Sequence, residues 1–231
     1  MFADSHVGRR PGDEEPFLEA LELARRRGAR EISLLGDTFH FFIAHPNFET
    51  PAIRKFLEQA DRLAAAGVAV TYVEGNRDFF LRGSYVERHF RRVCEQETFQ
   101  AGARRFLLTH GDLLNERDYP YRFWRFLSKN RVSRAAVHLV PRRAANRIVW
   151  GVEARLQRTN FKHKTRLPLE TIRAFAKRRF REGIDVVLLG HFHESWGEDV
   201  DGGRVEILPA FVEKRRWMEV ADDGATSLVS L

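Results

Sequence analysis

Cysteine is almost absent from this chain. Cys94 is the only cysteine among 231 residues, so an internal disulfide and a metal site built from several thiolates are both excluded. No apolar run approaches the ~20 residues that a membrane-spanning helix requires, and no signal peptide is visible at the start. We therefore expect a protein of a reducing compartment, in the cytoplasm.

Acidic residues are scarce in one stretch. Between residues 122 and 166 Glu153 is the only acid, while Arg and Lys alternate with bulky apolar residues such as Trp124. This pattern predicts a helical cap, inserted at residues 113–167 of a single domain that spans residues 1–231. Over the whole chain 39 Lys plus Arg exceed 32 Asp plus Glu, which favours an acidic partner such as a phosphate, nucleic acid or anionic lipid.

Helical and strand-like segments alternate along the chain. The apolar run that begins at Glu31 stops at Gly36, as expected of a buried strand in a parallel sheet. Further helices and strands follow from periodicity and Gly punctuation. We expect helices around residues 17–24, 53–64 and 169–181, and strands over 31–35, 68–73, 91–100, 104–109, 186–189, 204–208, 215–220 and 226–231. This alternation is typical of a layered α/β fold.

Five apolar runs each end in side chains of the kind that bind metal ions. The carboxyl ends of strands are where open α/β sheets place their chemistry. In an extended segment residues i and i+2 share a face, so Asp4 with His6, and His191 with His193, can each aim two groups the same way. Carboxylate, amide and imidazole donors together suit Mn, Fe, Zn or Co. The five endings are Asp4-Ser5-His6, Gly36-Asp37, Gly75-Asn76-Arg77-Asp78, His110-Gly111-Asp112 and Gly190-His191-Phe192-His193.

Taken in order, these five motifs closely resemble those of the calcineurin-like metallophosphoesterases. The resemblance implies a four-layer αββα sandwich with two divalent metal ions, expected to be Mn²⁺. It implies that one ion is held by Asp4, His6, Asp37 and His193, and the other by Asp37, Asn76, His110 and His191. Two cations about 3.5–4 Å apart clamp one phosphoryl group and a shared water. The catalytic residues implied are Asn76, Arg77 and His110.

The loop Gly75-Asn76-Arg77-Asp78-Phe79 is similar to that of the UDP-2,3-diacylglucosamine hydrolases of lipid A biosynthesis. This narrower resemblance implies cleavage of a pyrophosphate bond in a lipid-linked nucleotide sugar, with release of UMP and 2,3-diacylglucosamine 1-phosphate. It also implies a peripheral position on an anionic inner membrane and no nucleic-acid partner. The substrate-binding residues that it suggests are Arg77, Asp118, Tyr121 and the cap cations Arg155, Arg158, Lys162 and Lys164.

Two features depart from the family pattern. His40 stands where an acid is common, and the first strand is curtailed to Phe2 and Ala3. Two further acids have open roles. Asp78 and Asp112 either orient ligand imidazoles or accept hydrogen bonds from loop amides.

Two other classes of function compete with a lipid-linked pyrophosphatase. One is another metallophosphoesterase, such as a nuclease or a cyclic-nucleotide phosphodiesterase. The other is a non-catalytic binding module on the same fold. The complete ligand set argues against a binding module, and Arg77 together with the apolar and basic cap favours the pyrophosphatase over a nuclease.

Overall fold

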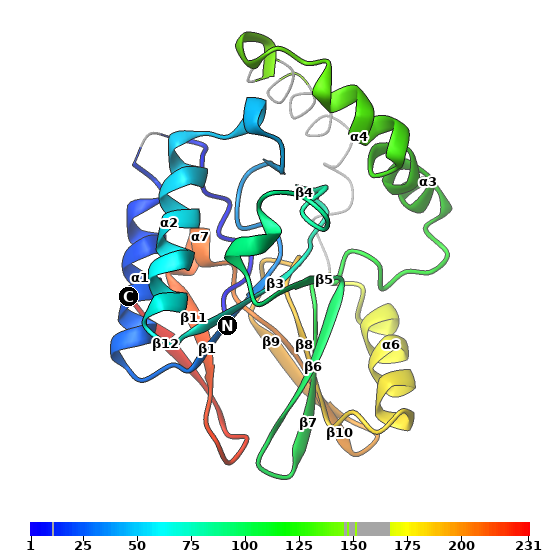
Figure 1. Ribbon diagram of the computed structural model, residues 1–231. Coiled ribbons are helices and arrows are strands. Elements are labelled where there is room, and N and C mark those ends of the chain that lie inside the picture. The colour runs from blue at the N-terminus through cyan, green and yellow to red at the C-terminus, as the bar shows by residue number, and fades with distance from the viewer. Residues whose placement is uncertain (11, 146, 148–150, 152–166) are drawn as a thin grey trace.

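Two β-sheets pack face to face, and helices cover the outer side of each (Figure 1). The computed structural model describes residues 1–10, 12–145, 147, 151 and 167–231. In this part of the chain the layers follow the order helix, sheet, sheet, helix. The expected αββα sandwich is therefore confirmed.

The first sheet is parallel, with the strand order β1-β3-β5. Its strands are β1 (Glu31–Leu35), β3 (Ala69–Val73) and β5 (Arg92–Cys94). The N-terminal segment lies against β1, where Phe2 bridges Leu34. The Phe2 N–H donates to the Ser33 carbonyl at 2.9 Å, and the Leu35 N–H donates to the Phe2 carbonyl at 2.7 Å. The first strand is thus reduced to a bridge that delivers Asp4 beside the end of β1.

Two helices, α1 (Glu15–Arg26) and α2 (Pro51–Ala65), cover the outer face of this sheet. Helix α2 begins at Pro51 because the Thr50 hydroxyl accepts the Ile53 N–H at 3.2 Å, and proline at the first position loses no helical hydrogen bond. Phe17 of α1 and Phe56 of α2 pack in one buried cluster with Tyr72 of β3.

The second sheet has the order β6-β7-β8-β10-β9. Strands β7, β8 and β10 are parallel, and β6 and β9 pair antiparallel at the two edges. Helix α6 (Leu169–Arg181) covers the outer face. The strand bounds are β6 (Gln96–Ala101), β7 (Arg104–Thr109), β8 (Val186–Leu189), β9 (Trp196–Val200) and β10 (Gly203–Ile207).

The apolar run of β8 is buried on both faces, which explains why it does not alternate with polar residues. Val186 and Leu188 belong to the cluster between the two sheets, whereas Val187 and Leu189 belong to the cluster under α6. Successive side chains of a strand point to opposite faces, so a strand covered on both sides must be apolar throughout.

One predicted strand is wrong. Residues 91–100 form two strands in different sheets, because Cys94 pairs with Val73 while Gln96 pairs with Thr109. The chain crosses from the first sheet to the second at Glu95. The last two predicted strands are present as β11 (Arg216–Val220) and β12 (Thr226–Ser230), and they pair antiparallel with each other.

Several short elements had no clear signal in the sequence. They are brief, so neither period nor composition distinguishes them from loops. They are β2 (Phe42–Ile43), the 3₁₀ helix η1 (Pro46–Phe48), β4 (Asp78–Phe79), β9 and α7 (Phe211–Lys214). A short helix that Tyr85, Val86 and Phe90 predict is present as the 3₁₀ helix η2 (Glu87–His89).

Two helices stand apart from the sandwich between β7 and β8, namely α3 (Tyr119–Ser128) and α4 (Arg131–His138), which we call the cap helices (Figure 1). Their apolar residues are largely exposed, with Phe123 at 63% and Phe126 at 67%. No helix among the described residues is long and apolar enough to cross a membrane. The cap helices reach the sandwich through polar side chains.

Candidate metal centre

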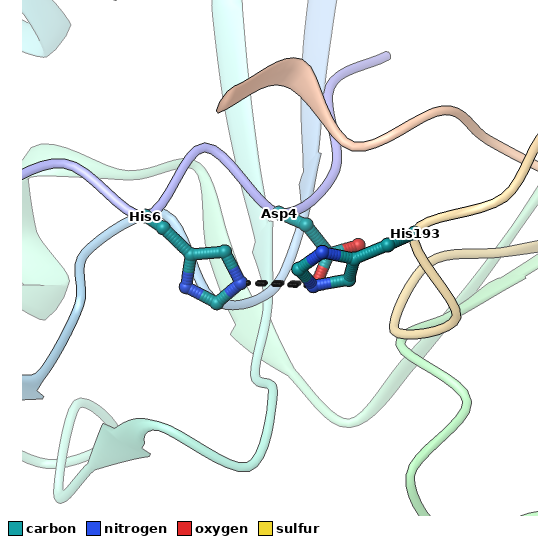
Figure 2. Close-up of side chains that lie close together, drawn as sticks. All are labelled: Asp4, His6 and His193. Atoms are coloured by element: carbon teal, nitrogen blue, oxygen red, sulfur yellow. Dashed lines mark hydrogen bonds and ion pairs between the residues drawn. The ribbon is translucent and has the colours of Figure 1, made fainter. Parts of the chain in front are cut away.

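Asp4, His6 and His193 point toward one another from two distant parts of the chain (Figure 2). Asp4 and His6 follow the Phe2 bridge, and His193 lies in the loop after β8. The Nε2 atoms of His6 and His193 are 3.1 Å apart. Asp4 Oδ1 lies 3.8 Å from the first of these nitrogens and 3.7 Å from the second. Three lone-pair atoms therefore surround one point, which we call the first group.

A second group is centred on Asp37 and His110. His110 Nε2 lies 3.7 Å from Asp37 Oδ1 and 3.0 Å from Asn76 Oδ1. His191 Nδ1 lies 3.1 Å from the same Asn76 oxygen and 3.3 Å from His110 Nε2. Asp4, Asp37 and His110 also offer ligand atoms within one metal-sized space, so Asp4 adjoins both groups. The structure thus brings all seven predicted metal ligands together at one edge of the two sheets.

The backbone is held in an unusual conformation at most of these positions. Non-glycine residues rarely adopt positive φ, and such residues cluster at functional sites. The five positive φ angles are 52° at Asp4, 44° at His6, 51° at Asp37, 72° at His191 and 61° at His193. Each lies just beyond a strand or bridge, where the turn directs the side chain into the centre.

Two glycines allow the loops to approach this closely. A Cβ at Gly75 would lie 2.4 Å from Asp37 Oδ1, and a Cβ at Gly36 would lie 2.6 Å from His110 Nδ1. Both distances are too short for any real contact. Glycine at these two positions is therefore required for Asp37 to meet the loop that carries Asn76.

The donor atoms fit a bound cation. Asp4 Oδ1 is buried and has no hydrogen-bond partner among the described residues, and the same is true of His6 Nδ1. A buried polar atom without a partner costs free energy. A cation in the first group would satisfy the Asp4 oxygen and separate the two facing imidazole nitrogens. The oxygen and nitrogen donors suit Mn, Fe, Zn or Co.

The pKa shifts of the residues in the centre also favour a bound cation. Burial raises the pKa of both Asp4 and Asp37 above the ordinary carboxyl value. Burial alone would lower the pKa of His110, but the carboxylates of Asp37 and Asp4 outweigh it and raise that pKa to about 9. Burial, together with the nearby basic side chains His193, Arg77 and Arg9, holds the pKa of His6 well below its usual value. Two poorly solvated carboxylates lie here, and a bound cation would relieve both.

Arg77 lies beside the second group. Its backbone N–H donates to Asp37 Oδ1 at 2.8 Å, and its Nε lies 3.6 Å from Asp37 Oδ2. Its Nη1 donates to the His40 carbonyl at 3.1 Å, and its guanidinium covers the ring of Phe41 at 5.3 Å. The guanidinium is thereby held at the rim of the metal centre.

The two acids with open roles bind different partners. Asp78 Oδ2 accepts the backbone N–H of Gly75 at 2.7 Å and that of Asp37 at 3.0 Å, and its Oδ1 accepts the Tyr72 hydroxyl at 2.9 Å. Asp78 therefore stabilises the loop amides. Asp112 instead accepts hydrogen bonds from the cap helix α3, donated by the hydroxyl of Tyr121 and by Nη1 of Arg125.

Apart from Arg77, the predicted substrate-binding residues divide into two sets. Asp118 caps α3, since its Oδ1 accepts the Tyr121 N–H at 3.0 Å. These contacts give Asp118 and Tyr121 structural roles, and their contact with substrate stays a prediction. Arg155, Arg158, Lys162 and Lys164 lie outside the described residues.

Sequence reasoning missed two side chains at the centre. Glu213 Oε1 lies 3.1 Å from His193 Nδ1 and so fixes which ring nitrogen faces Asp4. No local signal marks it, because α7 is four residues long. His40 is buried, and its Nδ1 accepts from Arg9 Nε at 3.0 Å. The sequence did carry one signal for His40, because it stands where an acid is common in the family.

Known proteins resemble this chain over nearly its whole length. No protein-family model matches it. The UDP-2,3-diacylglucosamine hydrolase of Stenotrophomonas maltophilia is 29% identical over 204 aligned positions, covering 84% of this chain and 81% of that protein. The protein of the same name from Xanthomonas campestris is 27% identical over 239 positions, covering 97% and 95%.

A solved structure supports the fold. A chain described as a novel archaeal phosphodiesterase aligns with a TM-score of 0.51 and 12% identity, covering 100% of this chain and 97% of that one. At this identity the likeness concerns the fold alone. The layers, the helical insertion and the sequence relatives agree. The chain therefore has the metallophosphoesterase fold and is a distant homologue of the UDP-2,3-diacylglucosamine hydrolases.

Proposed function

We propose that this protein is a metal-dependent hydrolase that cleaves the pyrophosphate bond of UDP-2,3-diacylglucosamine. The products are UMP and 2,3-diacylglucosamine 1-phosphate. The observation that carries the proposal is the meeting of two imidazole-carboxylate groups around Asp4 and Asp37. The near full-length similarity to proteins of that name supports the choice of substrate.

Two divalent ions, expected to be Mn²⁺, would supply a positive field for the phosphate oxygens and for the attacking water. Asp4, His6, Asp37 and His193 would hold the first ion, and Asp37, Asn76, His110 and His191 the second. In this assignment Asp37 would bridge the two ions; its Oδ1 lies 3.7 Å from His110 Nε2, and its Oδ2 lies 3.6 Å from Arg77 Nε. Asp78 accepts the backbone N–H of Asp37, and the Arg77 N–H donates to the Asp37 carboxylate, so the residue is held at both its backbone and its side chain.

Arg77 stabilises charge on the substrate. Arginine stays protonated at any working pH, so it is a poor general acid. A phosphate monoester is a leaving group that needs no proton, since its second pKa is about 6. A guanidinium held 3.6 Å from Asp37 Oδ2 can face the departing phosphate without transferring a proton.

The cap helices support a lipid substrate. Exposed Phe123, Trp124 and Phe126 lie on α3, which also carries the exposed cation Arg122, and the exposed cation Arg131 begins α4. Interleaved apolar and cationic residues suit a surface of acyl chains and anionic headgroups. Each cation near such a surface adds about 1 kcal/mol of attraction. We place the protein on the cytoplasmic face of an anionic inner membrane, without a nucleic-acid partner.

The direct test is a substrate comparison. Purified protein with Mn²⁺ is incubated with UDP-2,3-diacylglucosamine, or with a generic aryl phosphodiester and single-stranded DNA. Release of UMP from the first substrate alone supports the proposal. Equal or faster cleavage of the phosphodiester or of DNA would instead identify another metallophosphoesterase, and the lipid substrate would be wrong. No release from any of the three, with metal bound, would favour a binding module.

A further inference from the structure

The cap helix α3 contacts both loops that supply the second group of ligands. Arg125 Nη1 donates to Asp112 Oδ2 at 2.9 Å, two residues after His110. Lys129 Nζ donates to the Gly75 carbonyl at 2.7 Å, in the peptide group that joins Gly75 to Asn76. Lys129 is the C-cap residue of α3, directly after Ser128 and four positions after Arg125, so both side chains lie at the C-terminal end of the helix. This end of the helix therefore touches the His110 loop and the Asn76 loop together.

The Asn76 loop is held from two sides. Asp78 accepts the Gly75 N–H from within the sandwich. Lys129 binds the Gly75 carbonyl from the cap side, and its ammonium group also lies over the ring of Phe79 at 5.2 Å. The loop has little freedom to adjust in any other way, because a Cβ at Gly75 would already collide with Asp37.

The first group has no such link to the cap among the described residues. His193 bonds to Glu213 of α7, and Asp4 bonds to the backbone N–H of His191. His6 faces His193. All of these partners belong to the sandwich or to the loop after β8, so the position of α3 affects the two groups unequally.

We propose that Lys129 and Arg125 are positioning residues that couple the cap to metal binding at the second group. When α3 is in place, it fixes Asn76 and His110 at the separation that a metal ion needs. By linkage, a substrate that holds the cap in place then tightens metal binding at the second group, and metal there tightens substrate. This inference rests on the part of the proposed function that assigns metal ions to both groups.

The test is a Mn²⁺ titration of the whole chain, in which calorimetry and electron paramagnetic resonance measure the number of bound ions and the affinity of each site. The wild type is expected to bind two ions, and His193→Ala identifies which affinity belongs to the first group. Lys129→Met should weaken the second affinity about 10-fold, within the range seen when outer-sphere partners of metal ligands are removed, and should leave the first within two-fold. Lys129→Arg should restore much of the loss, and kcat should fall more than KM rises.

Arg134→Met is the matched control. Arg134 also ties a cap helix to the sandwich, by hydrogen bonds to the carbonyls of Arg82 and Gly83, neither of which is a proposed metal ligand. This variant should keep both affinities. If Lys129→Met does not fold, Arg125→Met tests the same coupling through Asp112.

Three results would overturn the inference: a wild type that binds fewer than two ions, a Lys129→Met protein with both affinities intact, or an equal loss in Arg134→Met. Failure of the proposed function looks different. In that case the wild type binds two ions and Lys129→Met loses the second selectively, while UDP-2,3-diacylglucosamine is not hydrolysed.

Discussion

The backbone N–H of Arg77 donates a 2.8 Å hydrogen bond to Oδ1 of Asp37, across a separation of 40 residues. The bond joins the loop after β1 to the loop after β3, which are neighbours because the two strands pair in parallel. Asp37 is therefore fixed by the residue that follows Asn76, and the two loops act as one unit. Substitutions of Asp37 and Arg77 therefore test the proposed reaction most directly.

Asp37→Ala should reduce turnover by more than ~100-fold, because loss of a direct ligand exceeds the 10–100-fold effect of losing an outer partner. The fold should persist, with about 1 kcal/mol lost because alanine is strained at a φ of 51°. Asp37→Asn is the control, since asparagine tolerates this backbone conformation but carries no charge. Steady-state kinetics and thermal unfolding measure both effects. Activity within a few-fold of wild type would reject the site assignment.

Arg77→Ala should slow hydrolysis of a pyrophosphate substrate far more than hydrolysis of an aryl phosphodiester. The guanidinium stabilises charge on a departing phosphate, a benefit that the phosphodiester does not need. Because the Arg77 N–H that binds Asp37 belongs to the backbone, the variant keeps that bond. Parallel kcat/KM measurements on the two substrates provide the comparison. An equal loss of kcat/KM on both substrates would contradict this role for Arg77.

Glu213→Ala should weaken metal binding at the first group by about 10–100-fold. The carboxylate 3.1 Å from His193 Nδ1 keeps the other ring nitrogen directed at Asp4. Lys214→Ala, at the next position of α7, is the matched control and should bind metal as the wild type does. Calorimetric titration with Mn²⁺ separates the two variants. Identical affinities would show that His193 needs no such support.

The protein should float with vesicles that contain anionic lipid, and the bound fraction should fall as salt rises. Replacing Arg155, Arg158, Lys162 and Lys164 with Ser should release it without unfolding it. As a control, serine at Arg26, Arg30, Arg178 and Arg181, four exposed cations of the sandwich helices and a nearby loop, should preserve binding. If the wild-type protein does not bind anionic vesicles even at low salt, the membrane-docking prediction is wrong and the cap covers a soluble substrate.

Cys94 should resist alkylation in the folded protein. Burial, reinforced by Glu97, raises the pKa of its thiol to about 12, so almost no reactive thiolate exists at pH 8. The raised pKa means that Cys94 favours folding below pH ~9 and that this contribution is lost as pH rises toward 12. Iodoacetamide labelling followed by mass spectrometry is the measurement, with urea-unfolded protein as the positive control. Rapid labelling of native protein at pH 8 would contradict the burial of this thiol.

The sequence by itself identified the long helices of the sandwich, most strands and the chemistry-bearing loops. Apolar periodicity is a local property, so α6 begins and ends at the predicted residues 169 and 181. Each candidate ligand also follows its own strand within a few positions. Parallel strands that end at one sheet edge must bring such loops together, which is why five separate motifs predicted one centre.

Only the tertiary structure decided which side chains meet. Glu213 reaches His193, and Lys129 reaches Gly75 across 54 residues, because sheet order and the path of the cap place them there. The split of residues 91–100 between two sheets has the same origin, since both halves are strand-like locally and pairing alone assigns each half to a sheet. Contacts between distant segments depend on how layers pack, and no local pattern of residues encodes that packing.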